Sequence, residues 1–290
     1  MNLRRILLTL GPGILFASTA IGTSHLVQAT RAGADYGFAL LWAVLAANIA
    51  KYPFFEFGTR YANATGTSLI AGYRTFGKWA SWTYLILTTL TCAFVMGGVG
   101  IVTASFLDHL FGVSQNLGFN ATPHVAVVTF TACVGVLFVG RFAALDKLIK
   151  AISLVLLIGT IGATAGALMH TPISAVPPAP ASFNPWQGAE FTFLIALLGW
   201  MPSAVDLSPW VSIWTLERYR QTGFTPRLRS ALSEFNLGYA FCVVLALCFL
   251  LLGALLLRTH EMALPSGTAA FAAGITALYT EVLGPWSAPF

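Results

Sequence analysis

Long stretches without a charged residue are the feature that most limits what this chain can fold into. Ser81–Leu107 and Ala151–Met169 contain no Asp, Glu, Lys or Arg. A helix needs about 20 mostly apolar residues to cross a bilayer, because each residue advances about 1.5 Å through a hydrocarbon core of about 30 Å. Both stretches are close to that length or longer, so we expect them to be membrane-spanning helices.

The composition supports an all-α integral membrane protein. Apolar residues make up 57% of the 290 residues and charged residues only 9%, whereas about a quarter of the residues in a soluble domain are charged. Arg4 and Arg5 precede an apolar run that has no clear small-residue cleavage site, so we expect this run to be the first span and not a signal peptide. The lipid bilayer is therefore the expected partner.

Seven spans fit the hydropathy pattern. They lie at roughly 7–29, 37–57, 81–107, 124–141, 148–169, 190–214 and 232–257. Thirteen of the 15 Lys and Arg residues then fall on one side, and only Arg31 and Arg258 on the other. The positive-inside rule places the larger group and the N-terminus in the cytoplasm, so the net charge of +5 reflects topology and not binding to nucleic acid. A cell (inner) membrane is the expected location.

Two of these spans carry residues that interrupt a helix. The first contains Gly22-Thr23-Ser24-His25 at mid-membrane, and the sixth contains Met201-Pro202-Ser203 followed by Asp206. Proline lacks an N–H and clashes with the preceding turn, so the sixth helix should open at that point. Irregular backbone at membrane depth is tolerated where it is buried in protein or lines a wet cavity. Interrupted helices at equivalent places of two repeats form the substrate site of many transporters.

Three side chains in these interruptions are candidate ligands. Asp206 is the acidic residue that lies deepest in a predicted span, and burying it without a partner would cost several kcal/mol. A structural hydrogen bond to a neighbouring helix is the alternative to a functional role. His25 either caps the opened helix or acts as a ligand or proton carrier, and Met201 offers a soft thioether that favours transition metals. Lys51 and Glu56, near the inner end of the second span, are interpreted as structural, either paired or reaching the interface.

Several motifs resemble the Nramp family of divalent metal transporters. The matching segments are Gly11-Pro12-Gly13, residues 28–33 (QATRAG), residues 36–42 (YGFALLW), Ala47-Asn48, Arg60, Ala64-Thr65-Gly66, Leu110-Phe111-Gly112 and Met201-Pro202. The resemblance covers essentially the whole chain and implies a leucine-transporter-like fold of two inverted five-helix repeats. Residues 1–170 would be the first repeat and 171–290 part of the second, within one transmembrane domain. Family members continue for several more spans, so the chain looks C-terminally truncated at Phe290.

The chain departs from this family where the chemistry is expected. The family's first-span Asp-Pro-Gly-Asn is replaced by Gly22 to His25, so this is a divergent member whose metal-binding Asp is Gly22. Met201 retains the methionine ligand, but Ser203 and Ser208 stand in place of two histidines. Family acidic residues linked to proton movement align with Met96 and Val99. Proton coupling by the family's route is therefore not expected.

The resemblance and the candidate side chains together predict a secondary transporter of a divalent transition metal such as manganese or iron. The expected substrate-binding residues are Gly22, Thr23, Ser24, His25, Met201, Ser203 and Asp206, and the expected metal ligands are His25, Met201 and Asp206. The metal would be the substrate, and no cofactor is expected. Two alternatives remain open: the same fold carrying a metal chelate or small organic solute, and a membrane sensor that does not transport.

A membrane enzyme is the least favoured class. The spans contain no HExxH, no GxSxG and no paired carboxylates, which are the arrangements that would indicate hydrolytic chemistry. Cys92, Cys133, Cys242 and Cys248 form no CxxC pair and are expected to pack as apolar residues. Nothing in the sequence indicates an oligomeric state.

Overall fold

The computed structural model describes residues 11–22, 24–259, 274 and 280, with the backbone alone at 140–145 and 147. These residues form helices, with no strand among them. The helices are α2 (Pro12–Ala20), η1 (Ser24–Ala29), α3 (Thr30–Tyr36), α4 (Leu41–Thr65), α5 (Leu69–Phe76), α6 (Lys78–Phe111), α7 (Val113–Leu117), α8 (Thr122–His170), η2 (Ile173–Ala175), α9 (Gly188–Trp200), η3 (Val205–Leu207), α10 (Ser208–Thr222), α11 (Leu228–Leu252) and η4 (Gly253–Arg258). The predicted all-α fold is confirmed.

Both predicted interruptions are present. The first span is divided into α2 and a π-helical segment, η1, that continues into α3. The sixth span is divided into α9 and α10, and a short 3₁₀ turn, η3, lies between them. We call residues 21–24 the first break and residues 201–204 the second break.

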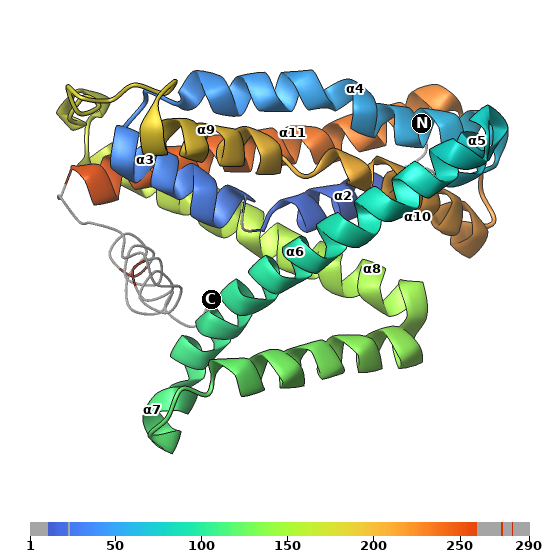
Figure 1. Ribbon diagram of the computed structural model, residues 1–290, viewed down its shortest axis with the longest axis horizontal. Helices are drawn as coiled ribbons and strands as arrows, with labels where there is room; N and C mark the ends of the chain where they lie inside the picture. Colours follow the sequence, from blue (N-terminus) through green and yellow to red (C-terminus); the bar gives the residue numbers. More distant parts are fainter. Residues whose placement is uncertain (1–10, 23, 260–273, 275–279, 281–290) are drawn as a thin grey trace.

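Five stretches of the described residues are long and apolar enough to cross a membrane. They are Lys78–Phe111, Thr122–Val139, Leu148–His170, Gly188–Thr222 and Leu228–Arg258. They correspond to the third to seventh predicted spans. The first predicted span is divided, and α4 carries Lys51, Glu56 and Arg60 along its length, so neither of the first two forms one long, uniformly apolar helix. The fourth and fifth spans belong to a single helix, α8, which changes direction between them (Figure 1).

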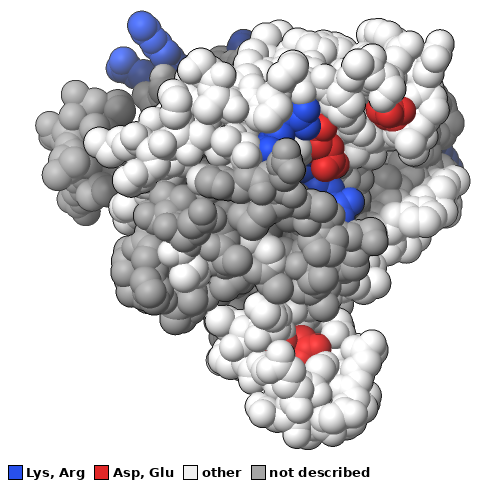
Figure 2. Space-filling view, turned by 90° about the vertical axis from the view of Figure 1, so that its left-hand side faces the viewer, with Lys and Arg blue, Asp and Glu red and all other residues white. Residues whose placement is uncertain are grey.

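Apolar side chains cover much of the surface of these helices. Phe94 on α6 is 78% exposed, and Phe138 and Val139 on α8 are 83% and 89% exposed. On the face drawn in Figure 2, charged side chains are few and most of the described surface is uncharged. Water would penalise so large an apolar surface, whereas lipid tails would not. This is the surface of an integral membrane protein.

The helix α11 is the central packing element of this arrangement. It contacts α2, α3, α4 and α8 and runs lengthwise beside α4, while α6 runs obliquely to both in this view (Figure 1). Glycines allow its closest contacts: a Cβ on Gly238 would lie 2.1 Å from the carbonyl oxygen of Gly13, and one on Gly33 would lie 2.0 Å from that of Leu250. Lipid supplies no hydrophobic force between membrane helices, so their association depends on close packing, and small residues let the backbones approach in this way.

The N-terminus of α2 is held by a buried carboxylate from α11. The backbone N–H groups of Gly11 and Gly13 both donate to Glu234 Oε1 at 2.9 Å, and Gly13 also donates to Oε2 at 3.0 Å. The first N–H groups of a helix have no partner within the helix, and the helix dipole favours a negative charge there. Glu234 therefore fixes where the first half of span one begins.

Candidate functional site

The first break lies between the end of α2 and the start of η1. Ala20 is the last residue of α2, and Ile21 and Gly22 continue without helical geometry until Ser24 begins η1. A Cβ added to Gly22 would have no neighbour within 4 Å, so the space beside this residue is open. Thr23 lies outside the described residues.

His25 is fully buried and uses both of its ring nitrogens. Its Nε2 lies 3.0 Å from the carbonyl oxygen of Cys242 on α11, and its Nδ1 lies 2.8 Å from Ser24 Oγ. A carbonyl oxygen only accepts, so Nε2 carries the proton in this contact. The neutral imidazole then has Nδ1 as its single acceptor, and this is the atom through which His25 would bind a metal.

The Ser24 hydroxyl has more acceptors around it than it has hydrogens. Its oxygen lies 2.8 Å from the Ala20 carbonyl oxygen, 2.8 Å from His25 Nδ1 and 3.2 Å from the Pro202 carbonyl oxygen. One hydroxyl hydrogen serves one of these at a time. The direction of this hydroxyl therefore depends on whether His25 Nδ1 accepts or donates.

The second break places Met201 and Pro202 between α9 and η3. Met201 is fully buried in an apolar cluster with residues of α4, α9 and α11, while Ser203 and Asp206 are partly exposed. The bond from Ser24 to the Pro202 carbonyl joins the two breaks directly. The structure thus brings Ser24, His25 and the Met201–Pro202 segment to one place in the helix core.

Asp206 faces a different helix. Its Oδ2 accepts a hydrogen bond from Thr91 Oγ1 at 2.5 Å, and its backbone carbonyl accepts one from the Tyr84 hydroxyl at 3.3 Å. Both partners lie on α6, the third span. Within the described part of the chain, no hydrogen bond links Asp206 to His25. Asp206 therefore has the structural partner that the sequence analysis gave as the alternative to a functional role.

Lys51 has a contact that the sequence did not predict. Its Nζ donates to the carbonyl oxygens of Gly199 at 2.7 Å and Ser203 at 3.1 Å, one on each side of Met201. Pairing with Glu56 was one of two alternatives for Lys51, and the structure does not form it, because Glu56 makes an ion pair of 2.6 Å with Arg60 one turn along α4. A lone lysine inside an apolar helix was the available signal, but nothing in the sequence indicates a backbone carbonyl as its partner.

The described residues contain no preformed metal cage. No group of three or more His, Cys, Asp and Glu side chains lies together in this part of the chain. The three predicted ligands would have to be supplemented by backbone carbonyls, and the carbonyls nearest the second break already accept from Lys51. The arrangement offers a thioether, an imidazole nitrogen and polar backbone at two broken helices.

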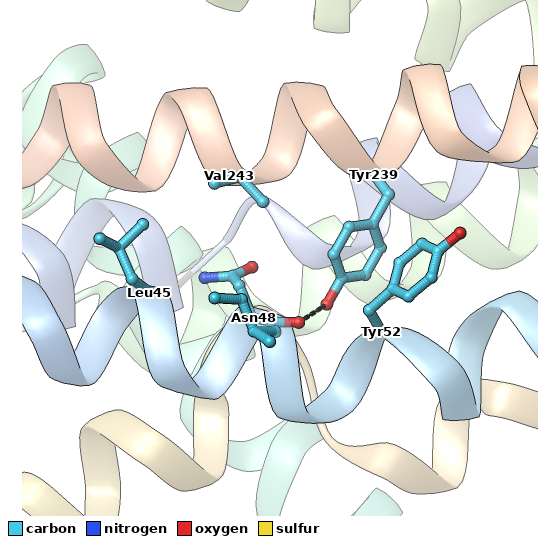
Figure 3. A pocket seen from close by; sticks show the side chains of 6 residues that line it. Leu45, Asn48, Tyr52, Tyr239 and Val243 are labelled. Atoms are coloured by element: carbon cyan, nitrogen blue, oxygen red, sulfur yellow. Dashed lines mark hydrogen bonds between the residues drawn. The ribbon is translucent and has the colours of Figure 1, made fainter.

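A separate hollow of about 290 Å³ lies between α4 and α11 (Figure 3). Its lining residues are Leu45, Asn48, Ile49, Tyr52, Tyr239 and Val243. The Tyr239 hydroxyl donates to the Asn48 carbonyl oxygen at 2.6 Å, as the dashed line shows. None of the predicted site residues lines this hollow, so it is distinct from the contact between the breaks.

Comparisons of this chain with known proteins find a matching family and a similar protein. The family model described as "Natural resistance-associated macrophage protein-like" (Nramp) matches residues 13–249. The chain is 33% identical over 279 residues to the uncharacterized protein PM0681 of Pasteurella multocida (strain Pm70). The matched region covers 96% of this chain and 63% of that protein. The chain thus spans less than two thirds of that relative's length. No solved structure matches it.

Proposed function

This chain belongs to the Nramp family, and on that premise we propose that it is part of a membrane transporter that carries a divalent transition metal of the manganese or iron type by alternating access. The substrate binds between the two breaks. The contact from Ser24 to the Pro202 carbonyl carries this proposal. It joins two interrupted helices that lie five spans apart, which is where inverted-repeat transporters place their substrate.

The chemistry of the donor atoms supports a transition metal. Met201 supplies a thioether, which is a soft ligand, and His25 supplies Nδ1. Asp206 is the carboxylate nearest in sequence to the second break and would add the negative charge that Gly22 no longer provides. Backbone at Gly22, Thr23 and Ser24 and the hydroxyl of Ser203 would complete the coordination once the substrate displaces the existing hydrogen bonds.

The remaining topology is part of the same proposal. Residues 1–170 form the first five-helix repeat and residues 171–290 form part of the second. The protein resides in the cell (inner) membrane with its N-terminus in the cytoplasm, which the excess of Lys and Arg on one side supports.

Metal uptake into proteoliposomes tests this function. We expect manganese or iron uptake by the full-length protein and its loss in Asp206→Ala, with Glu217→Ala, an exposed acidic residue on α10, as the matched control. Thr91→Val separates the structural role of Asp206 from its role as a ligand, because this substitution removes the hydrogen-bond partner of Oδ2 and leaves the carboxylate in place. Unchanged uptake in Asp206→Ala would remove this residue from the site, and absence of uptake by the wild type would refute the function.

A metal chelate or a small organic solute is the second candidate substrate. The observation that favours it is the open space at Gly22, where nothing lies within 4 Å of the missing Cβ. A larger and less positively charged substrate would fit where a carboxylate is absent. A thermal-shift screen separates the two candidates: stabilisation by bare manganese or iron alone rejects the chelate, and stabilisation by metal–carboxylate complexes alone rejects the bare ion.

A further inference from the structure

The end of α9 leaves backbone oxygens without helical partners. A helix ends with carbonyl groups that have no N–H above them, and these carry the negative end of the helix dipole. In α9 the helix stops at Trp200, and the chain reaches Ser208 before α10 begins. Gly199 in the last turn of α9 and Ser203 within the second break both present carbonyl oxygens that accept from Lys51 Nζ.

Lys51 reaches these oxygens from another helix. It lies near the middle of α4, 148 residues before Gly199 and 152 before Ser203. The 2.7 Å contact with Gly199 has the length of a charge-assisted hydrogen bond, and the 3.1 Å contact with Ser203 lies within the ordinary range for N–H···O bonds. The ammonium group therefore links the end of α9 to the second break.

No carboxylate neutralises this ammonium within the described part of the chain. The acidic side chain nearest to it on α4, Glu56, is paired with Arg60. The acidic side chain nearest to it on the broken span, Asp206, accepts from Thr91 on α6. Lys51 is thus a positive charge coordinated by backbone carbonyls, and this is how the broken helices of transporters bind inorganic cations.

Lysine suits this position in a way that arginine would not. Its ammonium is a compact point charge on a flexible stem, with three donors that turn toward whichever oxygens surround it, whereas guanidinium is a planar fork. We propose that Lys51 is a built-in cation that occupies a carbonyl site in the broken sixth span. A separate inorganic cation, such as sodium or potassium, would otherwise have to bind there to hold this segment open.

The proposal separates Lys51 from an ordinary helix cap. A cap stabilises the helix end and cannot be replaced by ions from solution. A carbonyl site that has lost its tethered cation becomes a vacant site, and a free cation can fill it. The difference is visible in stability alone and does not depend on which substrate the protein carries.

Thermal unfolding of the purified full-length protein in detergent tests this inference. Wild type, Lys51→Met and Lys51→Gln are compared in choline, sodium and potassium chloride at equal ionic strength. We expect wild type to have the same Tm in all three salts. Both variants should melt lower in choline and recover by about 3 °C in sodium or potassium, as expected when a ligand is well above its Kd.

Two further variants serve as controls. Lys51→Arg keeps a tethered positive charge that excludes a free cation, so its Tm should be independent of the salt, although the planar guanidinium fits the two carbonyls less well and should lower that Tm in all three salts. Lys78→Met removes a lysine from the first residue of α6 and should create no difference between choline and sodium. A Tm of Lys51→Arg that depends on the salt, or a Tm of Lys78→Met that differs between choline and sodium, would overturn the proposal.

The remaining outcomes also decide the matter. Variants that melt equally low in all three salts would make Lys51 only a cap. Variants with an unchanged Tm would show that the site needs no cation. A wild type stabilised by sodium or potassium over choline would show that the lysine does not fill the site. Failure of both variants to fold in any salt would show that free cations do not replace it.

Discussion

The hydroxyl oxygen of Ser24 lies 3.2 Å from the carbonyl oxygen of Pro202, although 178 residues separate the two in sequence. The same hydroxyl lies 2.8 Å from His25 Nδ1, and His25 in turn donates to the Cys242 carbonyl. Ser24 has one hydroxyl hydrogen, so it donates to one of these acceptors at a time and thereby connects the second break, His25 and α11. Low dielectric around these groups strengthens the bond that forms and penalises an acceptor left without a donor.

Removing the Ser24 hydroxyl should therefore loosen both breaks. We expect Ser24→Ala to lower the free energy of unfolding by about 1 to 3 kcal/mol, because it leaves a buried acceptor without its donor. Chemical denaturation in mixed micelles measures this loss. Ser233→Ala is the matched control, since Ser233 is exposed on α11 and bonds only within its own helix. Equal effects of the two substitutions would contradict the coupling of the breaks.

Replacing Met201 by leucine should change metal affinity more than stability. Met201 is fully buried in an apolar cluster, and a swap that keeps the volume costs less than about 1.5 kcal/mol. The thioether is lost, so we expect weaker binding of cadmium, a soft probe ion, and a smaller change for manganese. Isothermal titration measures both affinities.

Met96→Leu provides the comparison for this experiment. Met96 lies on α6 and is 48% exposed, so its substitution should leave both affinities unchanged. Cadmium affinity that is the same in Met201→Leu as in wild type would show that the thioether is not a ligand and that Met201 only fills the core.

Glu234→Gln should weaken the start of the first span. The carboxylate accepts three hydrogen bonds from Gly11 and Gly13, and a glutamine offers one acceptor oxygen and one donor in its place. We expect a loss of about 1.5 to 3 kcal/mol, the range for hydrogen bonds to a charged group. Hydrogen exchange at Gly13 should quicken as well. The same change at Glu217, whose contact with Arg220 is exposed, should have an effect near zero. A stable Glu234→Gln variant with slow exchange would contradict this role.

Alanine at Gly33 should be among the most damaging small substitutions in the chain. The new Cβ would lie 2.0 Å from the Leu250 carbonyl oxygen, and backbone cannot move aside as a flexible side chain would. We expect a loss of about 1 to 3 kcal/mol from overpacking. Gly162→Ala on α8 is the control, because nothing lies within 4 Å of its added Cβ, and it should be neutral or stabilising by up to about 1 kcal/mol. A tolerated Gly33→Ala would contradict the close approach of α3 and α11.

The sequence predicted best those features that depend on a few neighbouring residues. Pro202 removes a helical hydrogen bond wherever it sits, so the second break follows from local chemistry. Hydropathy located the third to seventh spans to within a few residues at most ends. It did not foresee that the fourth and fifth spans would share the single helix α8, because residues between two apolar stretches carry no sign of whether the backbone stays helical.

The partners of the site residues could not be predicted from the sequence. Asp206 stood out as an acidic residue in an apolar span, yet its partner Thr91 lies 115 residues away and resembles many other threonines. Lys51 was recognised as a charge within a helix, with either a pair with Glu56 or a reach to the interface expected for it. Its acceptors are backbone carbonyls, which every residue possesses and which therefore leave no signature in the sequence.

The glycine contacts of α11 bear on how the first break can move. Gly13, before the break, lies against Gly238, while Gly33, after it, lies against Leu250, and Thr30 lies against Gly253 at the start of η4. Both halves of the first span thus pack closely against one continuous helical segment, α11 and its extension η4. Because rotation at Gly22 would break the contacts of one half, we expect α2, α3 and α11 to move together in any rocking motion.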